Sequence, residues 1–504
     1  KYKMSDKSAE LSYEHWKNLA ANITFRNQAF INGTFTPASG ETYDVINPST
    51  ENVLASVTAC TDADVDSAVA FARESFESGV WSDQSPSDRK AVIIKLAQLI
   101  LDNKEELAVL ESLNMGKPVM EALNIDMQGA SAILAWYGEA ADKLYDEVAP
   151  TGVDSVATIT REPIGVVGAV VPWNFPLDLA IWKLGPALAA GNSVIVKPAE
   201  QSPHSVLRLA ELAIEAGLPK GVFNVVPGFG HVAGKALGIH PDVDVMTFTG
   251  STAVGKQFLN YSGESNMKPV WLETGGKSPN LVFADCDDLD KAADCAAAGI
   301  FFNQGEVCSA NSRLLVEDSI VDEFVAKMVE RADNVKIGDP LDPHTTMGPI
   351  VSRRQCERIR AYIKTGRNEG AKLQSGGNSV TVGNSSLYVE PTIFVEVNNQ
   401  MTIAREEIFG PVLSVIPFKS EEEAIAIAND TPFGLAASVW TDNLSRAHRV
   451  ARKLKAGTVS VNTIDALSPM TPFGGYKQSG IGRDLSIHAF DKFTQMKTTW
   501  IQLA

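Results

Sequence analysis

The sequence has few cysteines and few histidines. Its 504 residues include five cysteines and seven histidines. An odd, scattered set of cysteines without a CxxC motif argues against a disulfide framework and favours a reducing compartment. The histidines form no HExxH motif, so we expect no protein-built metal site. The five cysteines are Cys60, Cys286, Cys295, Cys308 and Cys356.

Long apolar runs and an excess of positive charge are also missing. No run approaches the roughly 20 residues that a membrane-spanning helix needs, and the start, Lys1 to Met4, carries no signal-peptide core. We therefore expect a cytoplasmic protein with no membrane partner. The 44 basic and 61 acidic residues give a formal net charge of −17. Such a surface repels phosphate backbones and argues against nucleic acid as a partner, although acidity also simply keeps a chain in solution.

The chain instead shows short apolar strands that alternate with amphipathic helices. A length of 504 residues exceeds one ordinary core, so two or three domains are expected. Strand–helix alternation predicts a parallel sheet covered on both faces. The first series has predicted strands at 164–171, 193–197, 222–226 and 243–247, and predicted helices at 203–216, 231–237 and 252–261.

A second series of the same kind follows. It starts with a predicted strand at 280–283, continues through a helix at 289–302 and a strand at 312–316, and ends near 458–462. A helical stretch at 87–114 precedes the first series. The sequence therefore predicts an α/β protein with two open parallel-sheet domains and a boundary near residue 275.

Two glycine-containing turns lie between a predicted strand and a predicted helix. The first runs from Gly228 to Gly234 and resembles a dinucleotide fingerprint with one residue too many; the second runs from Phe248 to Gly255. Free N–H groups at such helix starts can face a phosphate. Either turn is also compatible with a purely structural role, so the nucleotide interpretation rests on their occurring together.

Three further sites carry chemistry but allow two interpretations each. Lys197 and Glu200 follow a strand, where they can bind ribose hydroxyls or form a solvated loop. Cys308 follows a glycine and polar residues at an apparent helix end, a setting that favours a thiolate, yet most lone cysteines are inert. Glu273 ends an apolar strand and is either a capping residue or a general base.

Together these pieces resemble the aldehyde dehydrogenase superfamily, over essentially the whole chain from about residue 28. Several motifs match in family order, and the set is far more specific than any one of them. The segments between motifs are most similar to bacterial γ-glutamyl-γ-aminobutyraldehyde and guanidinobutyraldehyde dehydrogenases. The motifs are Pro172-Trp-Asn-Phe-Pro176, Lys197-Pro-Ala-Glu200, Phe248-Thr-Gly-Ser251, Glu273-x-Gly-Gly-Lys277, Phe302-Asn-Gln-Gly-x-x-Cys308, Glu406-Glu-Ile-Phe-Gly-Pro411 and Pro472-Phe-Gly-Gly-Tyr-Lys477.

The resemblance implies a catalytic mechanism. Cys308 attacks the aldehyde carbon, and the Asn174 amide and the Cys308 backbone N–H hold the oxyanion. Hydride transfer to NAD leaves a thioester, which a water activated by Glu273 hydrolyses. Lys183 and Asp484 match positions that relay protons from the base. Relatives usually carry Glu at the second position, so the shorter Asp484 departs from the pattern.

The resemblance also implies a cofactor site. Lys197 and Glu200 bind the adenosine ribose, and Glu407 binds the nicotinamide ribose beside Phe409. Thr274 replaces the commoner Leu next to the base. The remaining residues expected around NAD are Val171, Pro172, Trp173, Ala199, Gly230, Gly234, Phe248, Thr249, Gly250, Ser251, Val254, Gly255 and Leu272.

A tunnel for the aldehyde is implied as well. Asp178 interrupts an apolar run there, and it either receives the distal cation of an aminoaldehyde from polyamine catabolism or points to Lys183 or solvent. Asp465 at the tunnel mouth would add negative charge. The other expected substrate residues are Phe175, Leu179, Trp182, Phe302, Val307, Ser309 and Phe473.

The resemblance divides the chain into four parts and implies a dimer or tetramer. The parts are an N-terminal extension (1–27), an NAD-binding domain (28–142 and 162–275), a catalytic domain (276–477) and an oligomerisation β-ribbon (143–161 and 490–504). Alternatives are a general aliphatic or hydroxy-aldehyde dehydrogenase, a CoA-acylating or NADP-preferring enzyme of the same fold, and a non-catalytic relative. Glu273 argues against the acylating enzyme, and the presence of Cys308, Asn174 and Glu273 argues against the non-catalytic relative.

Overall fold

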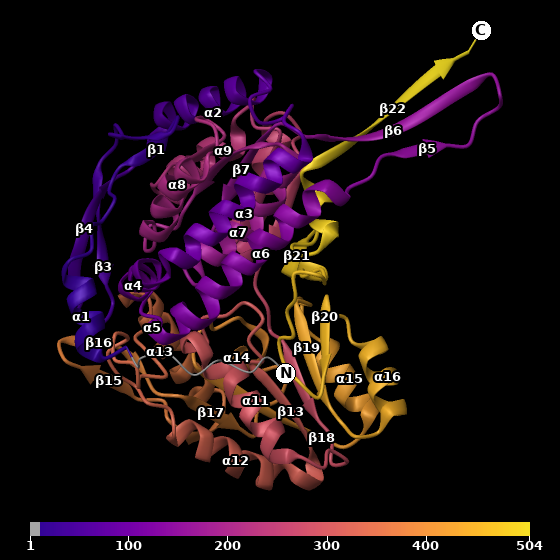
Figure 1. Cartoon of the computed structure of the whole chain (residues 1–504). Coiled ribbons are helices and arrows are strands. Elements are labelled where there is room, and N and C mark those ends of the chain that lie inside the picture. Colours follow the sequence, from indigo (N-terminus) through magenta and orange to yellow (C-terminus); the bar gives the residue numbers. More distant parts are fainter. Residues whose placement is uncertain (1–10, 504) are drawn as a thin grey trace.

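The structure, a computed structural model, describes residues 11–503 (Figure 1). Residues 1–10 of the predicted N-terminal extension therefore lie outside the described residues. Its remainder forms α1 (Tyr13–Ala21), whose N-cap is Ser12. Trp16 of this helix is fully buried in the first core, and the Tyr13 hydroxyl donates to Asp339 at 2.7 Å. This part of the extension is thus packed against the body of the protein.

The first sheet has five parallel strands at its centre, in the order β9-β8-β7-β10-β11. The predicted strands of the first series are confirmed, to within a few residues at their ends. Antiparallel strands extend both edges of this sheet. Its strands are β1 (Ala29–Ile31), β2 (Thr34–Thr36), β7 (Val166–Val170), β8 (Ser193–Lys197), β9 (Phe223–Val225), β10 (Val245–Thr249), β11 (Val270–Glu273) and β21 (Gly480–Ile481).

Helices cover both faces of this sheet (Figure 1). The predicted helical stretch at 87–114 is confirmed and consists of two helices, because Asn103 leaves the helical conformation and its side chain donates to the Leu99 carbonyl at 2.8 Å. The predicted helix at 231–237 begins as a π-helix, η3 (Gly230–Gly234). The helices are α2 (Asp62–Glu77), α3 (Pro86–Asp102), α4 (Lys104–Met115), α5 (Val119–Glu121), η1 (Ala122–Asp126), α6 (Met127–Ala140), α7 (Pro176–Ala190), α8 (His204–Ala216), α9 (Lys235–Ile239) and α10 (Thr252–Glu264).

The second sheet has the order β14-β17-β18-β13-β12-β19-β20, and every neighbouring pair except β14–β17 is parallel. Its strands are β12 (Pro279–Val282), β13 (Arg313–Glu317), β14 (Lys372–Ser375), β17 (Thr392–Val395), β18 (Val412–Phe418), β19 (Ala436–Trp440) and β20 (Thr458–Val461). Its helices are α11 (Leu289–Phe301), α12 (Val321–Asp333), α13 (Arg353–Asn368), α14 (Thr402–Arg405), α15 (Glu421–Asn429) and α16 (Leu444–Lys453). The chain passes from the first sheet to the second between Glu273 and Pro279.

A three-stranded ribbon projects away from both layers (Figure 1). Its order is β22-β6-β5, from β5 (Glu147–Ala149), β6 (Ser155–Pro163) and β22 (Thr494–Gln502). It exposes large apolar side chains, including Val148 at 74% and Trp500 at 61%. Two hairpins complete the fold: β3 (Thr42–Asn47) with β4 (Asn52–Thr58), and β15 (Ser379–Val382) with β16 (Ser385–Val389).

The expected α/β architecture of two parallel sheets and a ribbon is confirmed, with antiparallel strands at three sheet edges as a refinement. Within residues 11–503, no helix is long and apolar enough to cross a membrane.

Candidate active site

A pocket of about 740 Å³ lies where the two sheets meet. Residues from β10, β11 and the start of α7 line one side, and residues that follow α11 line the other. Most of the predicted site residues come together here although they are spread over more than 300 positions. The predicted residues that line the pocket are Pro172, Trp173, Asn174, Phe175, Asp178, Leu179, Trp182, Thr249, Gly250, Ser251, Glu273, Phe302, Val307, Cys308, Ser309, Glu407, Phe409, Asp465, Phe473 and Asp484.

Cys308 reaches the pocket because the chain turns sharply after α11. Asn303 and Gln304 adopt left-handed conformations, with φ of 48° and 59°. Gly305 follows with φ of 71°, and a Cβ there would lie 2.3 Å from the backbone of Gly410. Only glycine fits this close approach. The turn ends by presenting the half-buried Cys308 thiol to the pocket.

The surroundings of Cys308 do not favour the thiolate form that the sequence context suggested. Burial raises the pKa of the thiol, and the carboxylates of Asp465, Glu273 and Glu407 raise it further. A thiol in this setting stays protonated at neutral pH, so it needs a base to become a nucleophile.

Asn174 is fixed beside this cysteine. It is 2% exposed, and its Nδ2 donates to the Glu306 carbonyl at 2.9 Å. The amide of Asn303 donates in turn to the Asn174 carbonyl at 3.1 Å. An amide nitrogen carries two N–H groups, so one remains for a ligand. The backbone N–H of Cys308 donates to no backbone carbonyl of the described chain, and it too is available.

Glu273 is the last residue of β11 and is 6% exposed. Its Oε2 atom has no hydrogen-bond partner in the described chain, and an added Cβ on Gly474 would lie 2.7 Å from Oε1. Burial raises its pKa well above the usual value, and the nearby Asp484 carboxylate raises it further. A buried carboxyl of raised pKa that faces a pocket has the properties of a general base.

The predicted pair of Lys183 and Asp484 is in contact. Asp484 lines the pocket, whereas Lys183 lies behind it on α7 and does not. The structure adds Lys492, which binds the other oxygen of Asp484. Lys492 lies in no motif, and the one feature that marks it in the sequence is its place between Phe490 and Phe493.

The second glycine turn opens into the pocket. Ser251 is the N-cap of α10, and its hydroxyl accepts from the Val254 N–H at 3.4 Å. A Cβ on Gly250 would lie 2.6 Å from the ring of Phe248. Only glycine fits this close approach, and Gly250 and Ser251 both line the pocket, where a helix N-terminus favours a negatively charged ligand.

Other predicted cofactor residues lie on strands of the first sheet or on the loops and helices that follow them, outside the pocket lining. Glu200, after β8, accepts from the Gly230 N–H at 2.7 Å and lies 3.3 Å from the Lys197 ammonium. Glu407 does line the pocket; it accepts from the Gly276 N–H at 3.1 Å, and burial raises its pKa to about 7. The predicted cofactor residues outside the lining are Val171, Lys197, Ala199, Glu200, Gly230, Gly234, Phe248, Val254, Gly255 and Leu272.

Aromatic pairs and carboxylates line the substrate end. The ring centroids of Phe175 and Phe302 are 6.1 Å apart, and those of Trp182 and Phe473 are 5.2 Å apart. Asp465 accepts from the Ser309 hydroxyl at 3.0 Å. All nine predicted substrate residues line the pocket.

Asp178 faces the pocket and forms no ion pair with Lys183, which binds Asp484 instead. Its Oδ1 atom is buried with no hydrogen-bond partner in the described chain. Burial raises its pKa to about 7, with a further contribution from Asp126. This carboxylate is thus the kind of group that a cationic ligand would stabilise.

Sequence reasoning missed one wall of the pocket. Asp126 ends η1 within it and binds the buried Lys117. This wall carries no motif, because a helix interior that faces a pocket resembles one that faces a core. The other missed wall residues are Ile125, Gly129, Ala132 and Ile133.

Thr274 follows the predicted base Glu273 in the chain. Its hydroxyl donates to the Gln478 carbonyl at 2.6 Å, which ties the end of β11 to the segment that precedes Asp484.

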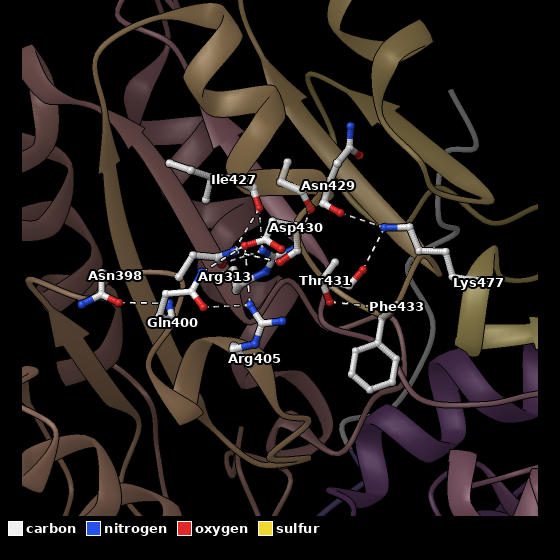
Figure 2. Close-up of polar contacts among 12 residues, drawn as sticks. Arg313, Asn398, Gln400, Arg405, Ile427, Asn429, Asp430, Thr431, Phe433 and Lys477 are labelled. Atoms are coloured by element: carbon white, nitrogen blue, oxygen red, sulfur yellow. Dashed lines mark hydrogen bonds and ion pairs between the residues drawn. The ribbon is translucent and has the colours of Figure 1, made fainter.

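A polar network joins Arg313 and Lys477 to the chain around residues 427–431 (Figure 2). Arg313 on β13 is fully buried and donates to the carbonyls of Ile427 and Ala428 at 3.0 and 2.8 Å. Lys477 donates to the carbonyls of Asn429 and Thr431, each at 2.8 Å. Lys477, the last residue of the family motifs, therefore anchors the segment that bears Phe473 and Asp484.

The part of the chain that the structure describes contains no group of three metal-binding side chains. Its five cysteines are unpaired.

Comparisons with known proteins agree on one family. The model of the aldehyde dehydrogenase family matches residues 35–499. The NADP/NAD-dependent aldehyde dehydrogenase PuuC of Escherichia coli (strain K12) is 53% identical over 490 residues, which span 97% of this chain and 98% of PuuC.

Two solved structures extend the comparison. The crystal structure of an indole-3-acetaldehyde dehydrogenase with NAD+ is 56% identical at a TM-score of 0.97, covering 98% of this chain and 100% of that one. The γ-glutamyl-γ-aminobutyraldehyde dehydrogenase of Burkholderia cenocepacia J2315 is 52% identical at a TM-score of 0.96, with the same coverage. Because the family model and these relatives span nearly the whole chain, the protein belongs to the aldehyde dehydrogenase family.

Proposed function

We propose that this member of the family oxidises an aldehyde to a carboxylic acid with NAD, through a thioester on Cys308. One observation carries the proposal: the thiol of Cys308, the amide of Asn174 and the carboxyl of Glu273 line one pocket with the open helix start at Gly250. A nucleophile, an oxyanion donor and a base in one cavity are what covalent oxidation of an aldehyde needs.

In the first step, the Cys308 sulfur bonds to the aldehyde carbon. The thiol proton passes to a base in the pocket, since the resting thiol is protonated. The electron pair of the C=O bond moves to oxygen, where the free N–H of Asn174 and the backbone N–H of Cys308 stabilise it. Loss of hydride from the tetrahedral thiohemiacetal leaves the thioester.

NAD fits the residues around the helix start. A Cβ on Gly275 would lie 2.3 Å from Glu407 Oε2, so the backbone approaches that carboxylate closely. Glu407 can bind one ribose, Lys197 and Glu200 the other, and the N-terminus of α10 can face the phosphates. When bound there, NAD accepts the hydride.

Hydrolysis completes the reaction. Glu273 removes a proton from water, the resulting oxygen adds to the thioester carbonyl, and the C–S bond breaks to release the acid and restore Cys308. NADH formation with NAD and a panel of aldehydes, without CoA, tests this function. A strict need for CoA, or no turnover with any aldehyde, would contradict it.

NAD should be preferred over NADP. The Glu200 carboxylate lies at the expected ribose position and repels a 2′-phosphate, while Lys197, 3.3 Å away, softens that repulsion. Glu200→Gln should therefore raise the efficiency with NADP relative to NAD by roughly tenfold. The same change at the exposed Glu215 of α8 is the control. Equal kcat/KM values for both cofactors in the unaltered enzyme would disprove the charge argument.

We propose further that the substrate is an aminoaldehyde of polyamine catabolism. The relative named for γ-glutamyl-γ-aminobutyraldehyde, at 52% identity, supports this class. The unpartnered Asp178 oxygen, with Asp465 in the same pocket, supports a cationic substrate end. A general aliphatic or hydroxy-aldehyde remains the competing substrate class.

Asp178→Asn should raise KM for aminobutyraldehyde-type substrates about ten- to a hundredfold, as expected for a charge-assisted contact of roughly 1.5–3 kcal/mol. Propanal, which carries no charge, serves as the control and should respond little. Since the Asp178 pKa is about 7, the carboxylate becomes charged as pH rises through that value, and KM for the cationic aldehyde should fall over the same range. Equal effects on both substrates would contradict this assignment.

We also propose a homo-oligomer, a dimer or tetramer, formed through the ribbon. The exposed Val148, Met496 and Trp500 of β5 and β22 support this role, because exposed apolar strands commonly pair between subunits. The proposed domains are those of the sequence prediction, with NAD on the first sheet and catalysis on the second. Five unpaired cysteines support a reducing compartment, and we propose the cytoplasm.

A further inference from the structure

One carboxylate beside the pocket is shared by two buried lysines. Lys183 on α7 binds Oδ2 of Asp484, and Lys492, the last residue of η7 (Ile487–Lys492), binds Oδ1. The exposed fractions of the three side chains are 1% for Lys183, 4% for Lys492 and 0% for Asp484. Each carboxylate oxygen therefore has its own ammonium partner, away from bulk solvent.

The three groups carry one more positive charge than negative charge. An uncompensated charge is costly in a buried site. The carboxyl of Glu273 lies close by and is buried as well. When Glu273 is ionised, the four groups are neutral in sum. With Lys183 and Asp484 alone, an ionised Glu273 would be the uncompensated charge.

The backbone fixes this group against Glu273. Phe473 and Asp484 exchange two backbone hydrogen bonds of 2.7 Å, and Gly480 pairs with Glu273 across β21 and β11. Gly474 lies against Glu273 Oε1. The segment 473–484 thus holds the carboxylate with its two lysines on one side and the base on the other.

The charged neighbours of Glu273 come from several elements. Burial and the Asp484 carboxylate raise the pKa of Glu273, whereas Lys183, Lys492 and Arg483 lower it. The Cys308 thiol faces it from the other side of the pocket. Around Asp484, burial acts to raise the pKa, but the two lysines outweigh burial and hold it below its usual value.

Tyr137 also faces Asp484. Burial and that carboxylate raise the pKa of its hydroxyl, so it stays neutral at physiological pH.

We propose that Lys492 is a positioning residue for the general base. With Lys183 it holds Asp484 as a charged carboxylate, and it supplies the positive charge that offsets ionised Glu273. Aspartate is one methylene shorter than the glutamate expected at this position, and Lys492 binds it on the oxygen that Lys183 leaves free. The inference rests on the proposed function, because it requires Glu273 to act as a base in thioester hydrolysis.

The test is the pH dependence of thioester hydrolysis in Lys492→Met. Without the ammonium, ionised Glu273 is less favourable, so its pKa rises and the acid limb of the hydrolysis rate should move up by about one pH unit. The NADH burst of the first turnover, recorded by rapid mixing on the same samples, should persist. Lys492→Arg keeps the charge and should return the acid limb to its original pH.

Lys327→Met is the matched control, since Lys327 lies on α12 and pairs with Asp290 at the surface. Its acid limb should not move. A rate lowered equally at every pH in Lys492→Met would show a structural role only and overturn the inference. If that variant fails to fold, Lys492→Arg decides, because a shifted limb despite the retained charge would contradict it. Absence of a burst in the unaltered enzyme would refute the proposed function instead.

Discussion

Replacing Cys308 with alanine should abolish aldehyde oxidation. The pocket places this thiol beside the Asn174 amide, and without the sulfur no covalent intermediate can form. We expect kcat/KM to fall by roughly four orders of magnitude or more, as for other enzymes that lose their nucleophile. The measurement is NADH formation at saturating NAD, with NAD affinity, followed by protein fluorescence, staying within a few-fold of the unaltered value.

Cys295→Ala is the matched control. Cys295 lies on α11, thirteen positions before Cys308, is also half-buried and unpaired, and does not line the pocket. It should keep its activity. Substantial turnover in Cys308→Ala, or an equal loss in Cys295→Ala, would show that the nucleophile has been assigned wrongly.

Replacing Glu273 with glutamine should slow hydrolysis of the thioester far more than its formation. Loss of a general base typically lowers a rate about 10²- to 10⁴-fold. Rapid mixing should therefore show an NADH burst followed by a slow steady state. The shape of the variant is nearly unchanged, because an amide replaces a carboxyl whose Oε2 makes no hydrogen bond within the described chain.

The pH dependence provides a second readout. Burial and Asp484 raise the pKa of Glu273 well above that of an exposed glutamate. The base form is favoured above this raised pKa, so hydrolysis in the unaltered enzyme should accelerate as pH rises through it. In Glu273→Gln this limb should vanish. If the burst is lost instead, Glu273 acts on Cys308 before the thioester forms.

Strands and helices that have a distinctive residue pattern along the chain could be predicted from the sequence. The strands around Val194 and Met246 are short apolar runs between turn signals, and the structure has them as central strands. The residues Cys308, Asn174 and Glu273 lie in motifs, and they do share a pocket.

Features that depend on contacts between distant residues were out of reach. The raised pKa of Cys308 depends on burial and on the carboxylates of Asp465, Glu273 and Glu407, which meet only after folding. Likewise, nothing local to Lys492 indicates that it binds Asp484 or that Lys183 binds the same group. The break at Asn103 is a case of a side chain competing with the helix backbone, which the apolar periodicity on either side conceals.

The strand β21 has a consequence for how the enzyme is made. It comes from residues 480–481, yet it closes a sheet whose other strands lie within residues 29–273. A growing chain that ends near residue 275 would hold both glycine turns and Glu273 but neither β21 nor Asp484. Because such long-range pairing forms late, the general base acquires its surroundings only when nearly the whole polypeptide has emerged. Nascent chains or protease-clipped fragments that end before residue 480 should thus lack the strand that pairs with Glu273, and they should not complete a turnover.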